Sequence, residues 1–441
     1  MTIAERSMGL GLRALGAIAG SDVVDRLGMR EPAERFLYRA TRDGFRAASA
    51  AGRSFKVVRG GGSATRLRPA GAGLFDLTPT DEQQFLTETL LDFADTRLRA
   101  AASRADAACA APPELLAQAA ELGIAMLGVP EELGGAVSES STVTAALSAE
   151  ALAHGDLGLA GAILAPTAVG TALSLWGDAD QQQTYLPTLV ADEPPVAALC
   201  LQEPRALFDP FALRTTARRD GGDFVIAGEK SLVIHGEAAE LLIVAAALED
   251  GSGPALFLVE TSETDAGLLL RRAAPAMGLR PAATADLRFE DVRVPARALV
   301  GEGDPAVYAE CVRRARLAWS ALAVGTARAV LDYVTPYVNE RVAFGEPISH
   351  RQAVAFGVSN IAIELEGMRL VTLRAASRAD MGKDFSREVA LARSLCASKG
   401  TWIGSEGVQL LGGHGYVKEH PVERWYRDLQ AAALAEGGVL V

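Results

Sequence analysis

Apolar residues recur at helical spacing between residues 76 and 195. Thr78-Pro79-Thr80-Asp81 places a capping residue and a proline directly before apolar positions three or four residues apart, which predicts the start of a helix. Further helices are expected at 112–123, 141–154, 157–175 and 180–187. This segment is therefore predicted to be an N-terminal helical domain.

Near residue 196 the pattern changes to short β-prone runs separated by turn residues. The sequences Asp220-Gly-Gly-Asp223 and Asp250-Gly-Ser-Gly253 are typical of hairpin connections. Strands are expected at 196–201, 213–218, 224–226, 231–234, 241–247, 255–260, 268–271 and 285–289. We interpret residues 196–300 as a central antiparallel β domain.

The helical pattern returns in residues 301–441. Long helices are predicted at 306–341, 352–381 and 388–411, and their frequent small residues favour close helix packing. The expected fold class is α+β, with an N-terminal helical domain, a central antiparallel β domain and a C-terminal four-helix bundle.

Residues 1–75 differ from the rest because they carry thirteen Arg or Lys against six acidic residues, although the whole chain has a net charge of −12. Amphipathic helices are expected at 8–19 and 31–51, followed by a glycine-rich linker at 60–73. Such a basic extension suits an acidic partner or weak contact with an anionic membrane. Packing against its own acidic body is the alternative.

Composition narrows the class of protein. A hydrophobic fraction of 49% predicts a globular chain, and the negative net charge argues against nucleic acid as a partner. The four cysteines are far apart and lack metal or disulfide spacing, so we expect reduced thiols and no metal site. No run reaches roughly 18 uninterrupted apolar residues. We expect a cytoplasmic location, or a peripheral one at the membrane through the extension.

The C-terminal stretch 431–441 holds a single acid, Glu436, among small and apolar residues. A carboxyl group in such surroundings is a candidate general base, because an apolar environment raises its pKa. A solvated chain end with an exposed glutamate is the alternative reading of this stretch alone.

Several short motifs occur in a consistent order over residues 76–441. Val129-Pro-Glu-Glu-Leu-Gly-Gly135, Gln202-Glu-Pro204 and Phe289-Glu-Asp-Val-Arg-Val-Pro295 are followed by three more. These are Arg341-x-x-Phe344-Gly345-x-Pro347, Gln409-Leu-Leu-Gly-Gly413 and Pro421-Val-Glu-Arg424 with Arg427-Asp428. With this set, the chain resembles the acyl-CoA dehydrogenase family of flavoproteins.

The resemblance implies dehydrogenation of the α,β bond of an acyl-CoA thioester, with hydride transfer to FAD. It also implies an electron acceptor such as an electron-transfer flavoprotein, and a homodimer or homotetramer. The FAD-binding positions it implies are Gln202, Arg341, Phe344, Gln352, Gln409, Gly412 and Gly413. Arginine can hold a diphosphate through bidentate contacts, and glycines allow close backbone approach, in the family from a neighbouring subunit.

The catalytic base implied by the resemblance is Glu436, which falls eight residues after Asp428 and precedes Gly437. Arg316, nine residues before Gly325, matches an arginine that reaches this carboxylate. Some family branches place the base on the preceding residue, which here is Ala315. Gly437 and Phe208 are the predicted substrate contacts.

Some positions depart from the family pattern. Leu207 and Phe208 stand where the family has small or hydroxyl-bearing residues, and Leu232 and Ile234 replace a tryptophan and a threonine. Two alternatives to an active dehydrogenase therefore stay open. One is a non-catalytic subunit that forms a heteromer with a paralogue, and the other is an acyl-CoA-binding module without redox chemistry.

Overall fold

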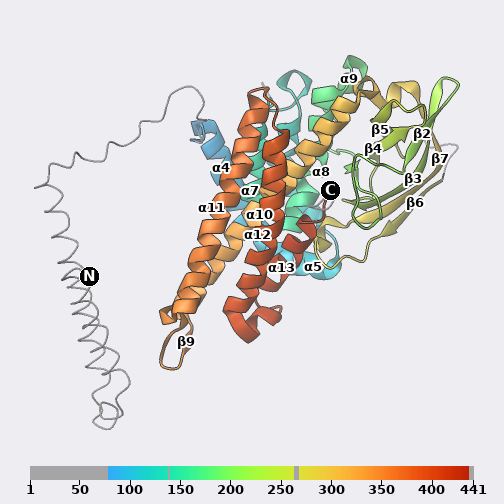
Figure 1. Cartoon of the computed structure of the whole chain (residues 1–441). Coiled ribbons are helices and arrows are strands. Elements are labelled where there is room, and N and C mark those ends of the chain that lie inside the picture. The colour runs from blue at the N-terminus through green and yellow to red at the C-terminus, as the bar shows by residue number, and fades with distance from the viewer. Residues whose placement is uncertain (1–77, 138–139, 263–267, 437–441) are drawn as a thin grey trace, which may run out of the picture. The chain divides into compact units, whose positions relative to one another are not determined.

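The fold is that of a computed structural model, which describes residues 78–137, 140–262 and 268–436. The basic extension with its two expected helices lies outside these residues, as does Gly437. The described chain combines a helical N-terminal part, a β-sheet and a long helical bundle (Figure 1). The predicted α+β class is confirmed.

The N-terminal helices are α4 (Asp81–Phe93), α5 (Arg99–Ala108), α6 (Pro113–Glu121), α7 (Thr142–Gly155), α8 (Leu157–Trp176) and α9 (Ala179–Leu189). The predicted cap is confirmed: the Thr80 hydroxyl accepts a hydrogen bond from Gln83 N, and the Gln83 side chain accepts one from Thr80 N. A π-helical turn, η1 (Ala94–Leu98), joins α4 to α5. A Cβ at Gly155 would lie 2.5 Å from Ala94 O, so α7 needs this glycine to pass the π-turn.

Among the described residues, α8 is the helix long and apolar enough to span a membrane by length and composition. Most of it is buried within the fold, as expected for a core helix of a globular protein. Asp156 caps its first turn by accepting a hydrogen bond from Leu159 N at 3.0 Å. The apolar character of α8 is thus explained by its position inside the fold.

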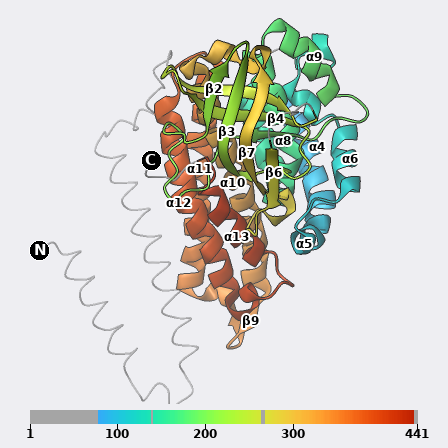
Figure 2. The same cartoon turned by 90° about the vertical axis from the view of Figure 1, so that its right-hand side faces the viewer.

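The sheet contains eight strands in the order β6-β7-β3-β2-β4-β5-β8, with β1 also paired to β4. Their bounds are β1 (Ala197–Cys200), β2 (Thr216–Asp220), β3 (Asp223–Val233), β4 (Leu241–Leu248), β5 (Gly253–Glu260), β6 (Leu268–Ala273), β7 (Ala285–Pro295) and β8 (Leu299–Val300). Figure 2 shows this sheet in front of the helices.

The sheet is mixed, not purely antiparallel as the hairpin signals predicted. One edge of β4 pairs in parallel with β1 along its first half and with β2 at its end, while the other pairings are antiparallel. The hairpin signals were local and identified β2–β3 and β4–β5 correctly. They carried no information about β1, which enters the sheet directly from the helical domain.

The C-terminal part consists of α10 (Pro305–Glu340), α11 (Gln352–Asp380), α12 (Ser386–Leu411) and α13 (Val422–Ala432). A short hairpin of β9 (Val342–Ala343) and β10 (Glu346–Pro347) joins α10 to α11, and the 3₁₀ turn η8 (Gly412–Tyr416) follows α12. A Cβ at Gly325 of α10 would lie 2.0 Å from Glu150 O of α7. This glycine therefore allows the bundle to pack directly against the N-terminal helices.

Candidate active site

Gln202 lies in the connection between two strands that share one edge of β4. Since β1 and β2 both pair with β4 in parallel, residues 201–215 must leave the sheet and return to the same edge. Glu203 joins the two ends of this connection, because its carboxylate accepts hydrogen bonds from Arg214 N at 2.9 and 3.0 Å and from Thr215 N at 2.9 Å. The folded connection directs the Gln202 side chain towards the C-terminal helices.

Glu436 lies in a turn after α13, in a left-handed backbone conformation with φ of +56°. Its N–H donates to Gln202 Oε1 at 2.8 Å, and its carbonyl oxygen accepts a hydrogen bond from Arg316 Nε at 2.9 Å. Three residues far apart in the sequence are thus brought together. Both polar backbone atoms of Glu436 are bound by side chains from other parts of the chain.

Arg393 of α12 anchors the residues that precede Glu436. Its guanidinium donates to the carbonyl oxygens of Ala432 at 2.7 Å and Ala433 at 2.9 Å, and to that of Ala435. The last carbonyls of a helix lack intrahelical partners, so this arginine serves as a C-terminal cap of α13. Burial, together with the charge of nearby Arg316, lowers the pKa of Arg393 to about 10.

The Glu436 carboxyl group is held in a dry environment. Its Oε2 atom is buried and has no hydrogen-bond partner among the described residues. Burial raises the pKa of Glu436, while a hydrogen bond from Trp319 and the positive charges of Arg393, Arg316 and Lys230 lower it. The result is a carboxylate that is more basic than one in water and has a free oxygen with which to take a proton.

A mainly apolar cavity of about 150 Å³ lies between α7, α8, α10 and β1. Cys311 and Ala315 contribute to it from the part of α10 that also carries Arg316. Burial raises the pKa of the Cys311 thiol, and the charge of nearby Glu436 adds to this shift. Small side chains form much of the wall, namely Ala145, Ala146, Ala149, Ala168, Ala172, Ala315 and Ala318.

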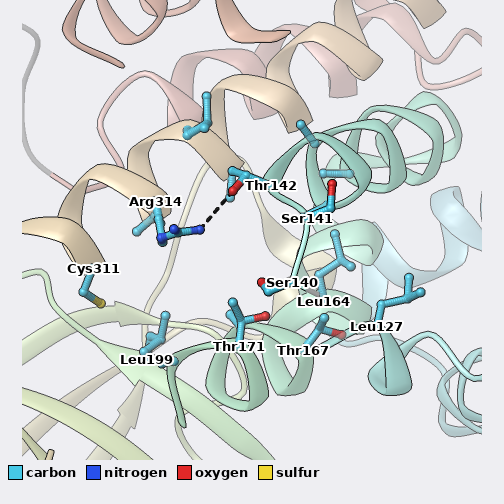
Figure 3. Close-up of a pocket in the computed structure, with 18 of the residues that line it drawn as sticks. Leu127, Ser140, Ser141, Thr142, Leu164, Thr167, Thr171, Leu199, Cys311 and Arg314 are labelled. Atoms are coloured by element: carbon cyan, nitrogen blue, oxygen red, sulfur yellow. Dashed lines mark hydrogen bonds between the residues drawn. The ribbon is translucent and has the colours of Figure 1, made fainter. Parts of the chain in front are cut away.

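Polar side chains border one part of this cavity (Figure 3). Arg314 donates through Nη1 to Thr142 Oγ1 at 3.0 Å and is paired with Glu310 at 2.8 Å. Ser140, Thr167 and Thr171 add hydroxyl groups to the lining. The cavity is suited to a short or medium apolar chain with limited polar contact.

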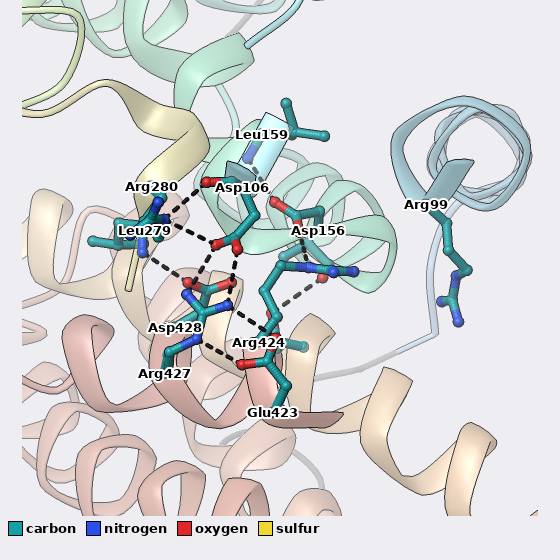
Figure 4. A network of polar contacts seen from close by, with 12 residues as sticks. Arg99, Asp106, Asp156, Leu159, Leu279, Arg280, Glu423, Arg424, Arg427 and Asp428 are labelled. Carbon is teal, nitrogen blue, oxygen red and sulfur yellow. Dashed lines mark hydrogen bonds and ion pairs between the residues drawn. The ribbon is translucent and has the colours of Figure 1, made fainter. Parts of the chain in front are cut away.

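A buried network of acids and arginines fixes α13, the helix that leads to Glu436 (Figure 4). Arg424 Nε lies 2.9 Å from Asp156 Oδ2 at the start of α8, and Arg427 binds Asp106 of α5 at 2.8 Å. Asp428 accepts a hydrogen bond from Leu279 N at 2.7 Å. Burial and the neighbouring Asp156 raise the pKa of Asp428 to about 8.

The other predicted cofactor-binding residues lie at a different place on the bundle. Arg341 directly follows α10, which ends at Glu340. At a rise of 1.5 Å per residue, this end of the helix is about 36 Å from Arg316. Phe344, in the β9–β10 hairpin, is 95% exposed, and Arg341 makes no ion pair among the described residues. Gln352, Gln409, Gly412 and Gly413 are also exposed.

The exposed residues have the chemistry of a site for a ligand with a diphosphate and aromatic rings. A Cβ at Gly412 or Gly413 would meet no atom within 4 Å, so the backbone is open to approach. Arg341 offers an unpaired guanidinium, which suits a diphosphate. Because Glu436 lies far along the bundle, one chain does not bring both groups together.

The remaining predicted positions fall outside the cavity. Phe208 is buried beside the guanidinium of Arg205, whose Cζ lies 5.3 Å from the ring centroid, and it does not line the cavity. Leu207 is exposed and, like Leu232, has a positive φ. Ile234 packs towards Gly161 of α8.

Sequence reasoning missed three residues of the site: Lys230, Trp319 and Arg393. Two of them, Lys230 and Arg393, are charged residues inside an apolar pattern, whereas Trp319 is an aromatic residue of α10. Lys230 interrupts the alternation of β3, and Arg393 falls among the inward positions of α12. Such interruptions were the available signal, but only the tertiary structure shows that these side chains surround Glu436.

Comparison with known proteins shows which protein family this chain matches. Three family models match: the N-terminal domain of acyl-CoA dehydrogenase at residues 80–193, the middle domain at 198–292 and the C-terminal domain at 306–438. The chain is 32% identical to the mitochondrial short-chain specific acyl-CoA dehydrogenase of Bos taurus, across 81% of this chain and 87% of that protein.

Two solved structures have the same fold. Butyryl-CoA dehydrogenase from Megasphaera elsdenii superposes with a TM-score of 0.76 at 27% identity, covering 83% of this chain and 97% of that one. An FAD complex of PigA superposes with a TM-score of 0.75 at 25% identity, covering 83% and 96%.

Proposed function

The chain belongs to the acyl-CoA dehydrogenase family, and we propose that it oxidises the α,β carbon–carbon bond of an acyl-CoA with FAD as cofactor. The observation that carries the proposal is the Glu436 carboxyl group, buried and with a free Oε2 atom. In this reaction the substrate loses a proton from the α carbon and a hydride from the β carbon. FAD, when bound, supplies the hydride acceptor.

Glu436 takes the α proton through Oε2. Burial makes this carboxylate a stronger base than one in water, and Arg316, Arg393 and Lys230 keep its ionised form accessible. The backbone contacts of Glu436 with Gln202 and Arg316 fix where the carboxylate points. Arg316 has a buried Nη2 atom without a partner among the described residues, which leaves a donor free next to the reacting group.

The cavity between α7, α8 and α10 would hold the acyl chain. Its alanine-rich walls exclude water and leave room for several methylene groups. Exclusion of water matters because a hydrated carboxylate would be a weaker base. This assignment makes the side chains at Ala315 and Ala168 determinants of the acyl groups that fit.

The exposed group at the far end of the bundle would bind the FAD of a second copy. Arg341 and the backbone at Gly412–Gly413 can contact a diphosphate, and Phe344, Gln352 and Gln409 are exposed beside them. Gln202 would contact the cofactor from the chain that also supplies Glu436. The protein would therefore act as a homodimer or homotetramer in which each cofactor is bound by two chains.

The further proposals concern partners and location. An electron-transfer flavoprotein would reoxidise the reduced cofactor, as implied by the family. We place the protein in the cytoplasm, with the basic residues 1–75 able to contact an acidic partner or an anionic membrane.

The test is the visible spectrum of the purified protein, followed by anaerobic mixing with acyl-CoAs of increasing length. Bound flavin should lose its absorbance on reduction. Glu436→Gln should slow this reduction by about 100-fold or more and leave the flavin spectrum in place. Glu114→Gln, an exposed glutamate of α6, is the matched control and should behave as wild type.

A colourless protein that stays inactive with added FAD and every acyl-CoA would overturn the proposal. That result would favour the non-catalytic alternatives. Co-expression with a paralogue would then test the heteromer, and acyl-CoA binding by calorimetry would test the binding module.

A further inference from the structure

A second buried ion pair, Lys230–Glu203, lies next to Gln202, and apart from the effect of the Lys230 charge on Glu436 the proposed reaction assigns it no task. Lys230 is fully buried and Glu203 is 3% exposed, and the Lys230 ammonium lies 3.3 Å from Glu203 Oε1. Removing one partner of such a pair leaves an uncompensated buried charge. Neither side chain lines the acyl cavity.

The Lys230–Glu203 pair is hydrogen-bonded to the main chain on both sides of Gln202. The Lys230 ammonium donates to Leu201 O at 3.2 Å, and Glu203 is bound to the backbone where residues 201–215 return to the sheet. The neighbouring Ser231 N donates to Gln202 O at 2.9 Å. The main chain around Gln202 is therefore fixed by contacts that all involve β3 or Glu203.

Gln202 links this part of the main chain to Glu436. Its side-chain oxygen accepts the Glu436 N–H at 2.8 Å, which joins the sheet to the turn that follows α13. The Glu436 N–H is thus held from the sheet side by Gln202, while its carbonyl oxygen is held from α10 by Arg316, so a displacement of Gln202 would strain or break the first of these two contacts. Displacements of about 1 Å at reacting groups can lower rates about 100-fold.

We propose that Lys230 is a positioning residue for the dehydrogenation: with Glu203 it fixes Gln202, and Gln202 fixes the backbone of Glu436. The inference rests on the proposed function of Glu436 as the base. Lys230 has a second influence, since its positive charge favours the ionised form of Glu436. Burial lowers the pKa of Lys230 to about 8, so this charge is present below that pH and is lost above it.

Several titratable groups face this region and enter any pH profile. Those acting on Lys230 are Glu203, Cys200 and Glu436. Those acting on or affected by Glu436 are Arg393, Arg316, Lys230, Cys200, Cys311 and Tyr308.

The first test is a double-mutant cycle on the rate of flavin reduction, using Lys230→Met, Gln202→Ala and the double variant. Lys230→Met should lower the rate by about 100-fold with a smaller change in KM. If Lys230 acts through Gln202, the double variant should be little slower than the worse single variant. Additive losses would overturn the inference. Lys399→Met, which breaks a partly exposed pair with Glu364 on the bundle surface, is the control.

The second test needs no catalysis. The Trp319 indole lies near enough to the Glu436 carboxyl group to favour its ionised form, so its fluorescence, taken as the difference from a Trp319→Phe variant, should report ionisation of Glu436. Lys230→Met should move the midpoint upwards by about one pH unit, because a nearby positive charge is removed. If Lys230→Met only loosened the structure, water would reach Glu436 and the midpoint of its titration would move downwards. That result would overturn the inference.

Folding of the variants is checked with Lys230→Met/Glu203→Gln, in which neither buried charge remains. This variant should unfold near the wild-type temperature and still show the slow reduction and the upward midpoint. Recovery of the wild-type rate would overturn the inference. The two proposals can fail separately. If Lys230→Met shifts the Trp319 titration as expected but the wild type shows no flavin reduction, the proposed function fails while the link from Lys230 to Glu436 stands.

Discussion

The buried ion pair between Arg424 and Asp156 offers a quantitative test of how α13 is held. Arg424→Met removes a guanidinium that is 7% exposed and leaves the fully buried Asp156 carboxylate with one remaining hydrogen bond, from Leu159 N. The folded protein can avoid the buried charge only by protonating Asp156. The free energy of that protonation sets the size of the effect.

The magnitude follows from the pKa of an unperturbed aspartate, 3.8. Protonating such a group at pH 7 spans about three pH units at about 1.4 kcal/mol each, or about 4 kcal/mol. At pH 5 the same step costs about 1.6 kcal/mol. The loss of stability should therefore grow with pH, since a carboxyl whose pKa is raised by folding stabilises the folded state at low pH and loses that contribution as the pH rises.

The assay is urea unfolding of Arg424→Met at pH 5 and pH 7, with flavin content held constant. Arg424→Met/Asp156→Asn should recover most of the loss, because asparagine keeps the oxygen that caps α8 and carries no charge. Arg104→Met is the control: its pair with Glu114 is 2.8 Å long but 70% and 61% exposed, and should be worth less than about 1 kcal/mol.

Equal losses in the buried and exposed variants would refute this reasoning. A loss for Arg424→Met that does not change between pH 5 and pH 7 would also refute it, because protonation of Asp156 would then not limit the effect.

Three further predictions concern packing and charge. Gly325→Ala should destabilise the protein by about 1–3 kcal/mol in thermal or urea unfolding, because the new Cβ would lie 2.0 Å from Glu150 O, whereas Gly222→Ala in an open hairpin should be near neutral. Ala315→Leu should fill part of the cavity and reduce kcat/KM more for longer acyl-CoAs than for short ones, and an equal loss for all lengths would contradict the assigned cavity. Burial raises the pKa of Asp428 to about 8, so wild-type stability should fall between pH 4 and pH 8, and Asp428→Asn should flatten this decline in urea unfolding.

Much of the fold was predictable because its signals are local. The Thr80 cap, the helical spacing behind it and the long helix ending near Arg341 all agree with the structure. The strands were less well predicted. Runs expected at 224–226 and 231–234 form one strand, β3, because Glu229 and Lys230 interrupt the apolar pattern without interrupting the strand.

The site was predictable only in part. The motifs identified Glu436, Arg316 and Gln202, and the structure brings these three within hydrogen-bond distance, while their catalytic roles stay predictions. Arg393 and Trp319 could not be found by spacing, because their contacts with the turn depend on how α10 and α12 pack. The predicted roles of Phe208 and Gly437, and the domain boundaries, also stay predictions.

Two of the helices that wall the cavity, α7 and α8, take no part in the support of Glu436, whereas α10 contributes to both through Ala315 and Arg316, and this partial separation bears on how such a protein can change. Alanines on α7, α8 and α10 shape the cavity, whereas Gln202, Lys230 and Arg393 hold the base from the sheet and from α12. Substitutions on α7 and α8 that resize the cavity need not disturb the base. Laboratory evolution towards new acyl groups should therefore collect its mutations on these two helices and leave the C-terminal turn unchanged.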